Sequence, residues 1–132
     1  MSIYTRTKAK ADELVSRGAH WKDVKEIAQQ SDFLFLMVGY PHDVEEVVFN
    51  NENGVLHHMK EGAVLIDHTT SSPGQAMRIY EEAKKKNIRF LDAPVSGGDI
   101  GAKNGKLVTM VGGDAEVVAH SMDLLKCYSA EV

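Results

Sequence analysis

Continuous apolar runs alternate along the chain with segments in which apolar residues recur at helical spacing. Residues 33–38 (FLFLMV) and 63–67 (AVLID) are typical of strands buried on both faces, as in parallel sheets covered by helices. Between them, Val44, Val47 and Val48 share one face of a helix. This alternation predicts an α/β fold in which a parallel sheet carries helices on both faces.

The apolar runs place five strands. They are predicted at Ser2–Tyr4, Phe33–Val38, Val64–Asp67, Arg89–Ala93 and Leu107–Val111. The last strand can run antiparallel at the edge of the sheet, because the glycine-rich residues 97–106 are too few for a helical crossover.

Helices are predicted from apolar spacing and from capping residues. They cover residues 5–18, 21–32 and 41–49, a segment capped by Ser71 or Ser72, and a segment from Asp114 to about Lys126. The first is expected to turn Ala9, Leu14 and Val15 toward the core and to end at Gly18. The second is expected to bury Trp21.

Composition narrows the classes of protein. A chain of 132 residues with 43% hydrophobic and 26% charged residues indicates one globular domain. The net charge of −4 gives no reason to expect nucleic acid as a partner, and no apolar run is long enough for a membrane span. Cys127 is the single cysteine and the histidines lack metal-ligand spacing, so no disulfide or metal site is expected. These features favour a cytoplasmic location.

Ligands of parallel α/β sheets bind at the carboxyl ends of the strands, so the residues that follow each predicted strand are the candidates for chemistry. Thr5–Lys8 (TRTK) follows the first. Dinucleotide-binding folds place an acid here for a free ribose 2′-hydroxyl, or a cation for a 2′-phosphate. Arg6 supplies a cation and Thr7 a hydroxyl. The alternative is a solvated start of a helix.

Two further strand ends carry small or polar residues. Val38, Gly39 and Tyr40 form a turn in which a backbone could approach a ligand, although an ordinary strand-to-helix turn has the same composition. Thr69 and Thr70 could bind an anion or could simply help cap the next helix. The neighbouring Asp67 and His68 are not a predicted catalytic pair, because adjacent strand residues point to opposite faces.

The segment after the fourth strand gives the strongest signal for a ligand. Ser96 offers a hydroxyl, and Gly97 and Gly98 offer two N–H groups that no side chain screens. Three such donors suit a carboxylate or phosphate oxygen. The spacing fits neither a nucleophile elbow nor a Walker loop. The alternative is a glycine-rich turn.

These stretches together resemble the β-hydroxyacid dehydrogenases, the family of 3-hydroxyisobutyrate dehydrogenase and tartronate semialdehyde reductase. The segments that carry the resemblance are TRTKAKADEL, GYPHDVEEVVFNNENGVL, GAVLIDHTTSSPGQA and FLDAPVSGGDIGAKNGKLVTMVGGD. The resemblance implies a Rossmann-like domain that binds NADP, or alternatively NAD. It implies that Arg6 and Thr7 hold the 2′-phosphate, and that Val38, Gly39, Tyr40, Thr69 and Thr70 line the cofactor. Ser96, Gly97 and Gly98 would hold the carboxylate of a small substrate.

Two family features have no counterpart in the sequence. The chain starts at what would be the second strand and lacks the Gly-x-Gly-x-x-Gly turn, and it stops before the helical domain with the family's catalytic lysine. We therefore expect residues 1–132 to be a partial NADP-binding domain of an oxidoreductase, without a catalytic residue of its own and inactive alone. The intact enzyme is expected to be a homo-oligomer. The alternative function is a noncatalytic module, either nucleotide-binding-like or for association.

Overall fold

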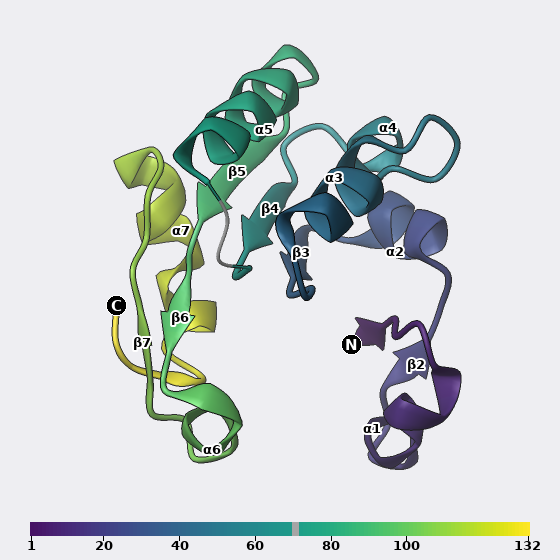
Figure 1. The fold of residues 1–132 in the computed structure, drawn as a ribbon, viewed down its shortest axis with the longest axis vertical. Helices are drawn as coiled ribbons and strands as arrows, with labels where there is room; N and C mark the ends of the chain where they lie inside the picture. Colours follow the sequence, from purple (N-terminus) through teal and green to yellow (C-terminus); the bar gives the residue numbers. More distant parts are fainter. Residues whose placement is uncertain (70–71) are drawn as a thin grey trace.

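The computed structural model describes residues 1–69 and 72–132 and contains three small sheets (Figure 1). The first pairs β1 and β2 in parallel, and the second contains β3, β4 and β5, also parallel. In the third, β7 runs antiparallel to β6 and parallel to β8. The strands are β1 (Ser2–Ile3), β2 (His20–Trp21), β3 (Phe33–Leu36), β4 (Val64–Asp67), β5 (Arg89–Asp92), β6 (Val95–Ser96), β7 (Leu107–Thr109) and β8 (Ser129–Glu131).

Seven α-helices and one 3-10 helix connect these strands in the described ranges. They are η1 (Lys8–Ala11), α1 (Asp12–Ser16), α2 (Val24–Gln30), α3 (Pro41–Phe49), α4 (Val55–His58), α5 (Pro73–Lys85), α6 (Gly98–Lys103) and α7 (Ala115–Leu125). Of the two candidate caps for α5, Ser72 caps the helix, and its hydroxyl accepts a hydrogen bond from the Gln75 N–H.

The core has two halves, one on each face of the β3–β4–β5 sheet. Leu34, Leu65 and Phe90 pack with helices α2 to α5. Val64, Ile66 and Leu91 alternate with them along the strands and pack against Val117 and Leu125 of α7. Figure 1 shows α5 and α7 on different sides of this sheet. The predicted α/β class, a parallel sheet with helices on both faces, is confirmed.

The first two predicted helices are partly wrong. Residues 5–18 form the short η1 and α1, and Ala9, Leu14 and Val15 are exposed, so only Ala11 of this segment is buried. Trp21 belongs to β2, because it pairs with Ile3 in parallel and α2 begins only at Val24. A strand of two residues is too short to give a period that sequence patterns detect.

β3 is also less buried than predicted. Its exposure alternates, because Leu34 and Leu36 point into the core shared with α2 to α5, whereas Phe35, on the opposite face, is 41% exposed. Residues 97–106 contain the short helix α6 and connect β6 to β7. β7 pairs antiparallel with β6, and Gly112 bridges Asp92 of β5 antiparallel as well, which agrees with the predicted reversal at the edge.

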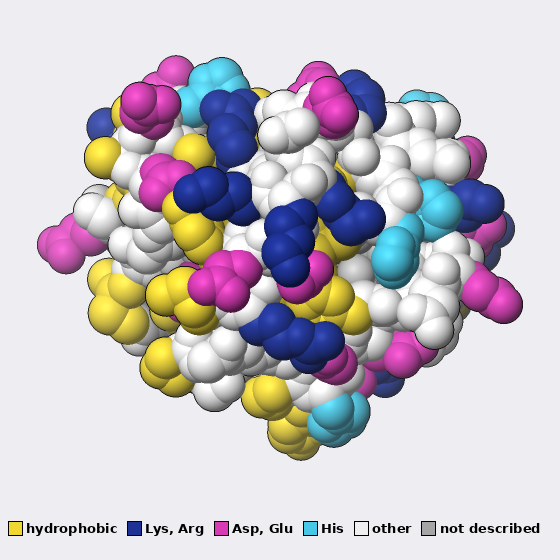
Figure 2. Space-filling view, turned by 90° about the horizontal axis from the view of Figure 1, so that it is seen from above, with side chains coloured by type: hydrophobic (Ala, Val, Ile, Leu, Met, Phe, Trp, Pro, Cys, Tyr) yellow, Lys and Arg dark blue, Asp and Glu magenta, His cyan; other side chains and the backbone are white. Residues whose placement is uncertain are grey.

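The surface carries both signs of charge. On the face seen from above in Figure 2, Lys and Arg side chains lie among Asp and Glu. Ion pairs such as Lys85–Glu82 and Arg78–Glu45 mix the two signs locally. In the described part of the chain, no helix has both the length and the apolar character needed to cross a bilayer.

Candidate functional site: a dinucleotide corner

The carboxyl ends of β3, β4 and β5 lie in register, which brings together the residues that follow them. Leu36 pairs with Asp67, and Asp67 with Asp92. Just beyond these ends, the Val38 N–H donates a hydrogen bond of 3.0 Å to Oγ1 of Thr69. Thr69 is only 3% exposed. Two predicted cofactor residues from separate strand ends are therefore in direct contact.

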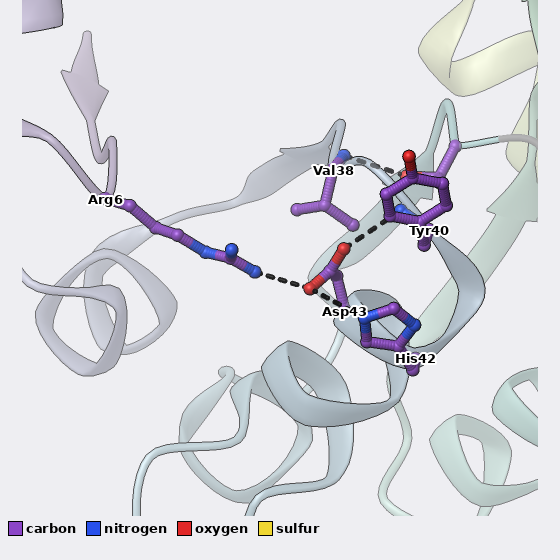
Figure 3. Close-up of polar contacts among 6 residues, drawn as sticks. Arg6, Val38, Tyr40, His42 and Asp43 are labelled. Carbon is purple, nitrogen blue, oxygen red and sulfur yellow. Dashed lines mark hydrogen bonds and ion pairs between the residues drawn. The ribbon is translucent and has the colours of Figure 1, made fainter.

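A second contact joins the first predicted segment to the turn after β3. The Arg6 guanidinium donates through Nη2 to Oδ1 of Asp43 at 2.5 Å, and Oδ2 of Asp43 accepts the Tyr40 N–H at 3.0 Å (Figure 3). We call Arg6, Tyr40 and Asp43 the dinucleotide corner. It connects residues 37 positions apart in sequence.

Local sequence explains why Asp43 occupies this place. Pro41 lies in the first turn of α3, where its missing N–H costs no helical hydrogen bond, and Asp43 is the third residue of the helix. A carboxylate at that position can reach back to the N–H of the residue before the helix, which has no partner within the helix. Asp43 does so, and its second oxygen remains to accept from Arg6.

The corner is electrostatically asymmetric. The Asp43 side chain is 11% exposed and the Arg6 side chain 73%. The hydrogen bond from Arg6, its charge and that of a protonated His42 lower the pKa of Asp43 below its ordinary value, against the opposing effect of burial. Asp43 is therefore a fixed anion, and Arg6 projects from it into solvent.

A hollow of about 510 Å³ borders the corner. Arg6 and Tyr4 line it from the β1 side, and Val24 and Val47 line it from α2 and α3. Thr7 is exposed at the start of η1 beside Arg6. The rest of the hollow's lining is polar and carries both signs of charge, from Asp23, Lys25, Glu46, Asn50 and Asn53.

The Ser96–Gly98 loop lies on another sheet. Ser96 ends β6, and all three residues are exposed. Gly97 and Gly98 have φ values of +127° and +64°, a region that residues with a Cβ rarely adopt. The structure thus gives the loop a backbone shape that depends on glycine, and within residues 1–69 and 72–132 no hydrogen bond joins it to the dinucleotide corner. Thr70, the remaining predicted cofactor residue, lies outside the described residues.

Asp67 and His68 face different partners. Oδ1 of Asp67 accepts the Thr69 N–H at 2.8 Å, and burial raises the pKa of Asp67. Nδ1 of His68 lies 2.6 Å from the Ala93 carbonyl oxygen, so it carries the proton, and Nε2 then accepts the Tyr128 hydroxyl at 2.6 Å. Burial raises the pKa of Tyr128 to about 12. These contacts hold strand ends together.

Sequence reasoning did not single out Asp43 as a site residue. Its signal was an acid two positions after Pro41, which marks the first turn of a helix and a carboxylate that can cap it. Its contact with Arg6 could not be seen before the fold placed the ends of β1 and β3 near each other. In the ranges 1–69 and 72–132, no group of three or more His, Cys, Asp or Glu could hold a metal ion.

Comparison with known proteins identifies the family. The family described as the NAD binding domain of 6-phosphogluconate dehydrogenase matches residues 1–132. The chain belongs to this NAD-binding domain family. The domain is therefore of a kind that binds a nicotinamide dinucleotide.

Relatives of this NAD-binding domain are oxidoreductases. The chain is 54% identical to the oxidoreductase YkwC of Bacillus subtilis (strain 168), over 92% of this chain and 42% of that protein. It is 41% identical to 2-hydroxy-3-oxopropionate reductase of Escherichia coli (strain K12), over 81% of this chain and 37% of the reductase. The solved structure of Psf3 in complex with NADP+ and 2-OPP superposes with a TM-score of 0.93 at 27% identity, covering 100% of this chain and 48% of Psf3. The chain thus spans less than half the length of these relatives.

Proposed function

We propose that this domain binds NADP in an oxidoreductase that transfers a hydride between the nicotinamide and a small β-hydroxyacid or its semialdehyde. Family membership and the reductase activity named for the Escherichia coli relative support the reaction class. The cofactor, when bound, supplies the hydride. We assign no catalytic residue within residues 1–132.

The observation that carries the NADP assignment is the dinucleotide corner. Arg6 uses Nη2 on Asp43, and its side chain is 73% exposed beside the hollow. A guanidinium has five N–H donors in a planar fork, so most of them are left for the oxygens of a 2′-phosphate. Thr7 adds a hydroxyl next to it. The position that would carry an acid in an NAD-selective fold is occupied by a cation.

The turn after β3 supports an assignment for the rest of the cofactor, beyond its 2′-phosphate. A Cβ on Gly39 would lie 3.5 Å from Oδ2 of Asp43, an ordinary contact, so protein packing alone does not require glycine there. Close passage of a ligand would require it. We therefore assign Val38, Gly39, Tyr40 and Thr69 to the cofactor side, and from the sequence alone Thr70 as well.

The Ser96–Gly98 loop is our proposed anchor for the substrate carboxylate. Ser96, Gly97 and Gly98 are all exposed residues, as access for a small anion requires. The anchor recognises the carboxylate and leaves the rest of the substrate to other residues. A panel of β-hydroxyacids offered to the complete protein with NADP+ identifies the substrate.

The test is a titration of the complete protein with NADPH and with NADH, for the wild type and for Arg6→Ala. A good Arg–phosphate contact contributes roughly 1.5–3 kcal/mol, so the variant should lose about tenfold or more in NADPH affinity. NADH affinity should hardly change, because NADH has no 2′-phosphate. Unchanged NADPH binding together with weaker NADH binding would show that Arg6 has been assigned wrongly.

A further inference from the structure

We propose that Asp43 is a positioning residue that sets the preference for a 2′-phosphorylated dinucleotide by holding the guanidinium of Arg6. The proposal rests on the function proposed above and adds a residue to it. Asp43 would not touch the cofactor. It would act through Arg6, from the first turn of α3.

Asp43 has the properties of a rigid anchor. Its residue is 8% exposed, and each carboxylate oxygen has a donor, the Tyr40 N–H for Oδ2 and Arg6 for Oδ1. His42 also lies near, with Nε2 3.6 Å from Oδ1. The bond to the backbone fixes where the carboxylate lies, and therefore where it can hold an arginine (Figure 3).

Arg6 needs such an anchor. It lies between a strand of two residues and η1, and its side chain is 73% exposed, so little packing restricts it. An unanchored arginine samples many rotamers, and ordering it on binding reduces affinity. The contact with Asp43 uses one nitrogen, which leaves Nη1 and Nε for a ligand.

The negative charge of Asp43 opposes this benefit, since it would repel a phosphate. Arg6 compensates that charge and gives up part of its own attraction for a phosphate in doing so, while the Tyr40 N–H stabilises the carboxylate, which is largely covered. We infer that positioning outweighs repulsion. Positioning predicts that removal of the Asp43 charge weakens NADPH binding, whereas repulsion predicts that it strengthens NADPH binding. One substitution therefore separates the two effects.

The experiment compares Asp43→Asn with Glu45→Gln in the complete protein, titrated with NADPH and NADH. Asparagine keeps an oxygen that can accept the Tyr40 N–H, and loses the charge that holds Arg6. Glu45→Gln removes the same charge from the same helix, where Glu45 pairs instead with Arg78. NADPH affinity should fall about three- to tenfold in Asp43→Asn and stay unchanged in Glu45→Gln. NADH affinity should stay within about twofold in both.

Two further variants test whether Asp43 acts through Arg6. Asp43→Glu keeps both the charge and the ability to cap the helix, so it should restore part of the NADPH preference. In the Arg6→Ala background, Asp43→Asn should cause no further loss, because no guanidinium remains to be positioned.

Three results would overturn the proposal. Equal or tighter NADPH binding by Asp43→Asn would mean that repulsion dominates or that Asp43 has no effect. Parallel loss of NADPH and NADH would assign Asp43 to folding of the turn alone. An additive loss of NADPH affinity in the double variant would show that Asp43 does not act through Arg6. If instead the wild type shows no NADPH preference, the proposed function itself fails. If Arg6→Ala abolishes the preference and Asp43→Asn does not, only the role of Asp43 fails.

Discussion

The dinucleotide corner and the Ser96–Gly98 loop are both predicted anion sites, yet they are built in different ways. The corner is formed by side chains, because the largely buried carboxylate of Asp43 pairs with the exposed guanidinium of Arg6. The loop depends on backbone shape, with two successive glycines at positive φ. A site made from an ion pair can change its selectivity by one substitution with little effect on the fold. A site made from glycine conformations cannot be altered without strain.

The largest expected effect on stability is that of Gly97→Ala in the loop. Its φ of +127° is strained for alanine, and the new Cβ would lie 3.3 Å from Cδ2 of Leu107. We expect a loss of about 2 kcal/mol in the free energy of unfolding, measured by urea denaturation.

Two other glycines are the matched controls for that measurement. Gly98 has a φ of +64°, and a new Cβ there would have no atom within 4 Å. Gly98→Ala should therefore lower the free energy of unfolding by about 1 kcal/mol, from the backbone alone. Gly74→Ala, in helix α5 with open space, should cost nothing. Equal stability of all three variants would mean that glycine conformation does not maintain the loop.

Thr69→Val should have an intermediate effect on stability. It tests how much the hydrogen bond between the ends of β3 and β4 contributes. Valine has the shape of threonine but cannot accept the hydrogen bond from the Val38 N–H. We expect a loss of about 1 kcal/mol in the free energy of unfolding, with Thr69→Ser close to the wild type. If the valine variant is as stable as the serine variant, Thr69 contributes packing alone.

Arg6→Ala should have the smallest effect on stability, since the ion pair is exposed on the arginine side. Because Arg6 lowers the pKa of Asp43 from the ordinary 3.8, the stabilisation is present above that pH and is lost as pH falls through the lowered value. Thermal melts of both proteins at low salt, from about pH 7 down to about pH 2.5, should converge at the acid end. A difference that grows in acid would contradict the assigned ion pair.

How far the sequence predicted the molecule depended on the length of each pattern. β4 was predicted with its observed bounds, because a short continuous apolar run between two helical segments is typical of a buried parallel strand. Trp21 was misplaced because its strand has only two residues, and its apolar spacing also fits the helix that follows. Arg6 was singled out by its residue type and its role stays a prediction, whereas its partner Asp43 was not predictable, since the contact arises only when the ends of distant strands meet.

The pairing of β1 with β2 has a consequence for hydrogen exchange. These strands form a sheet of their own, apart from β3–β4–β5 in Figure 1, and are joined by bonds such as His20 N–H to the Met1 carbonyl and Lys22 N–H to that of Ile3. The side-chain hydrogen bonds described from this unit to the rest are Arg6 to Asp43 and Lys22 to Gln30. Residues 1–22 can therefore open as a separate cooperative unit, and their amides would exchange long before those of β4. A ligand bound by Arg6 would slow that opening, so cofactor binding and local order at the amino terminus would be linked.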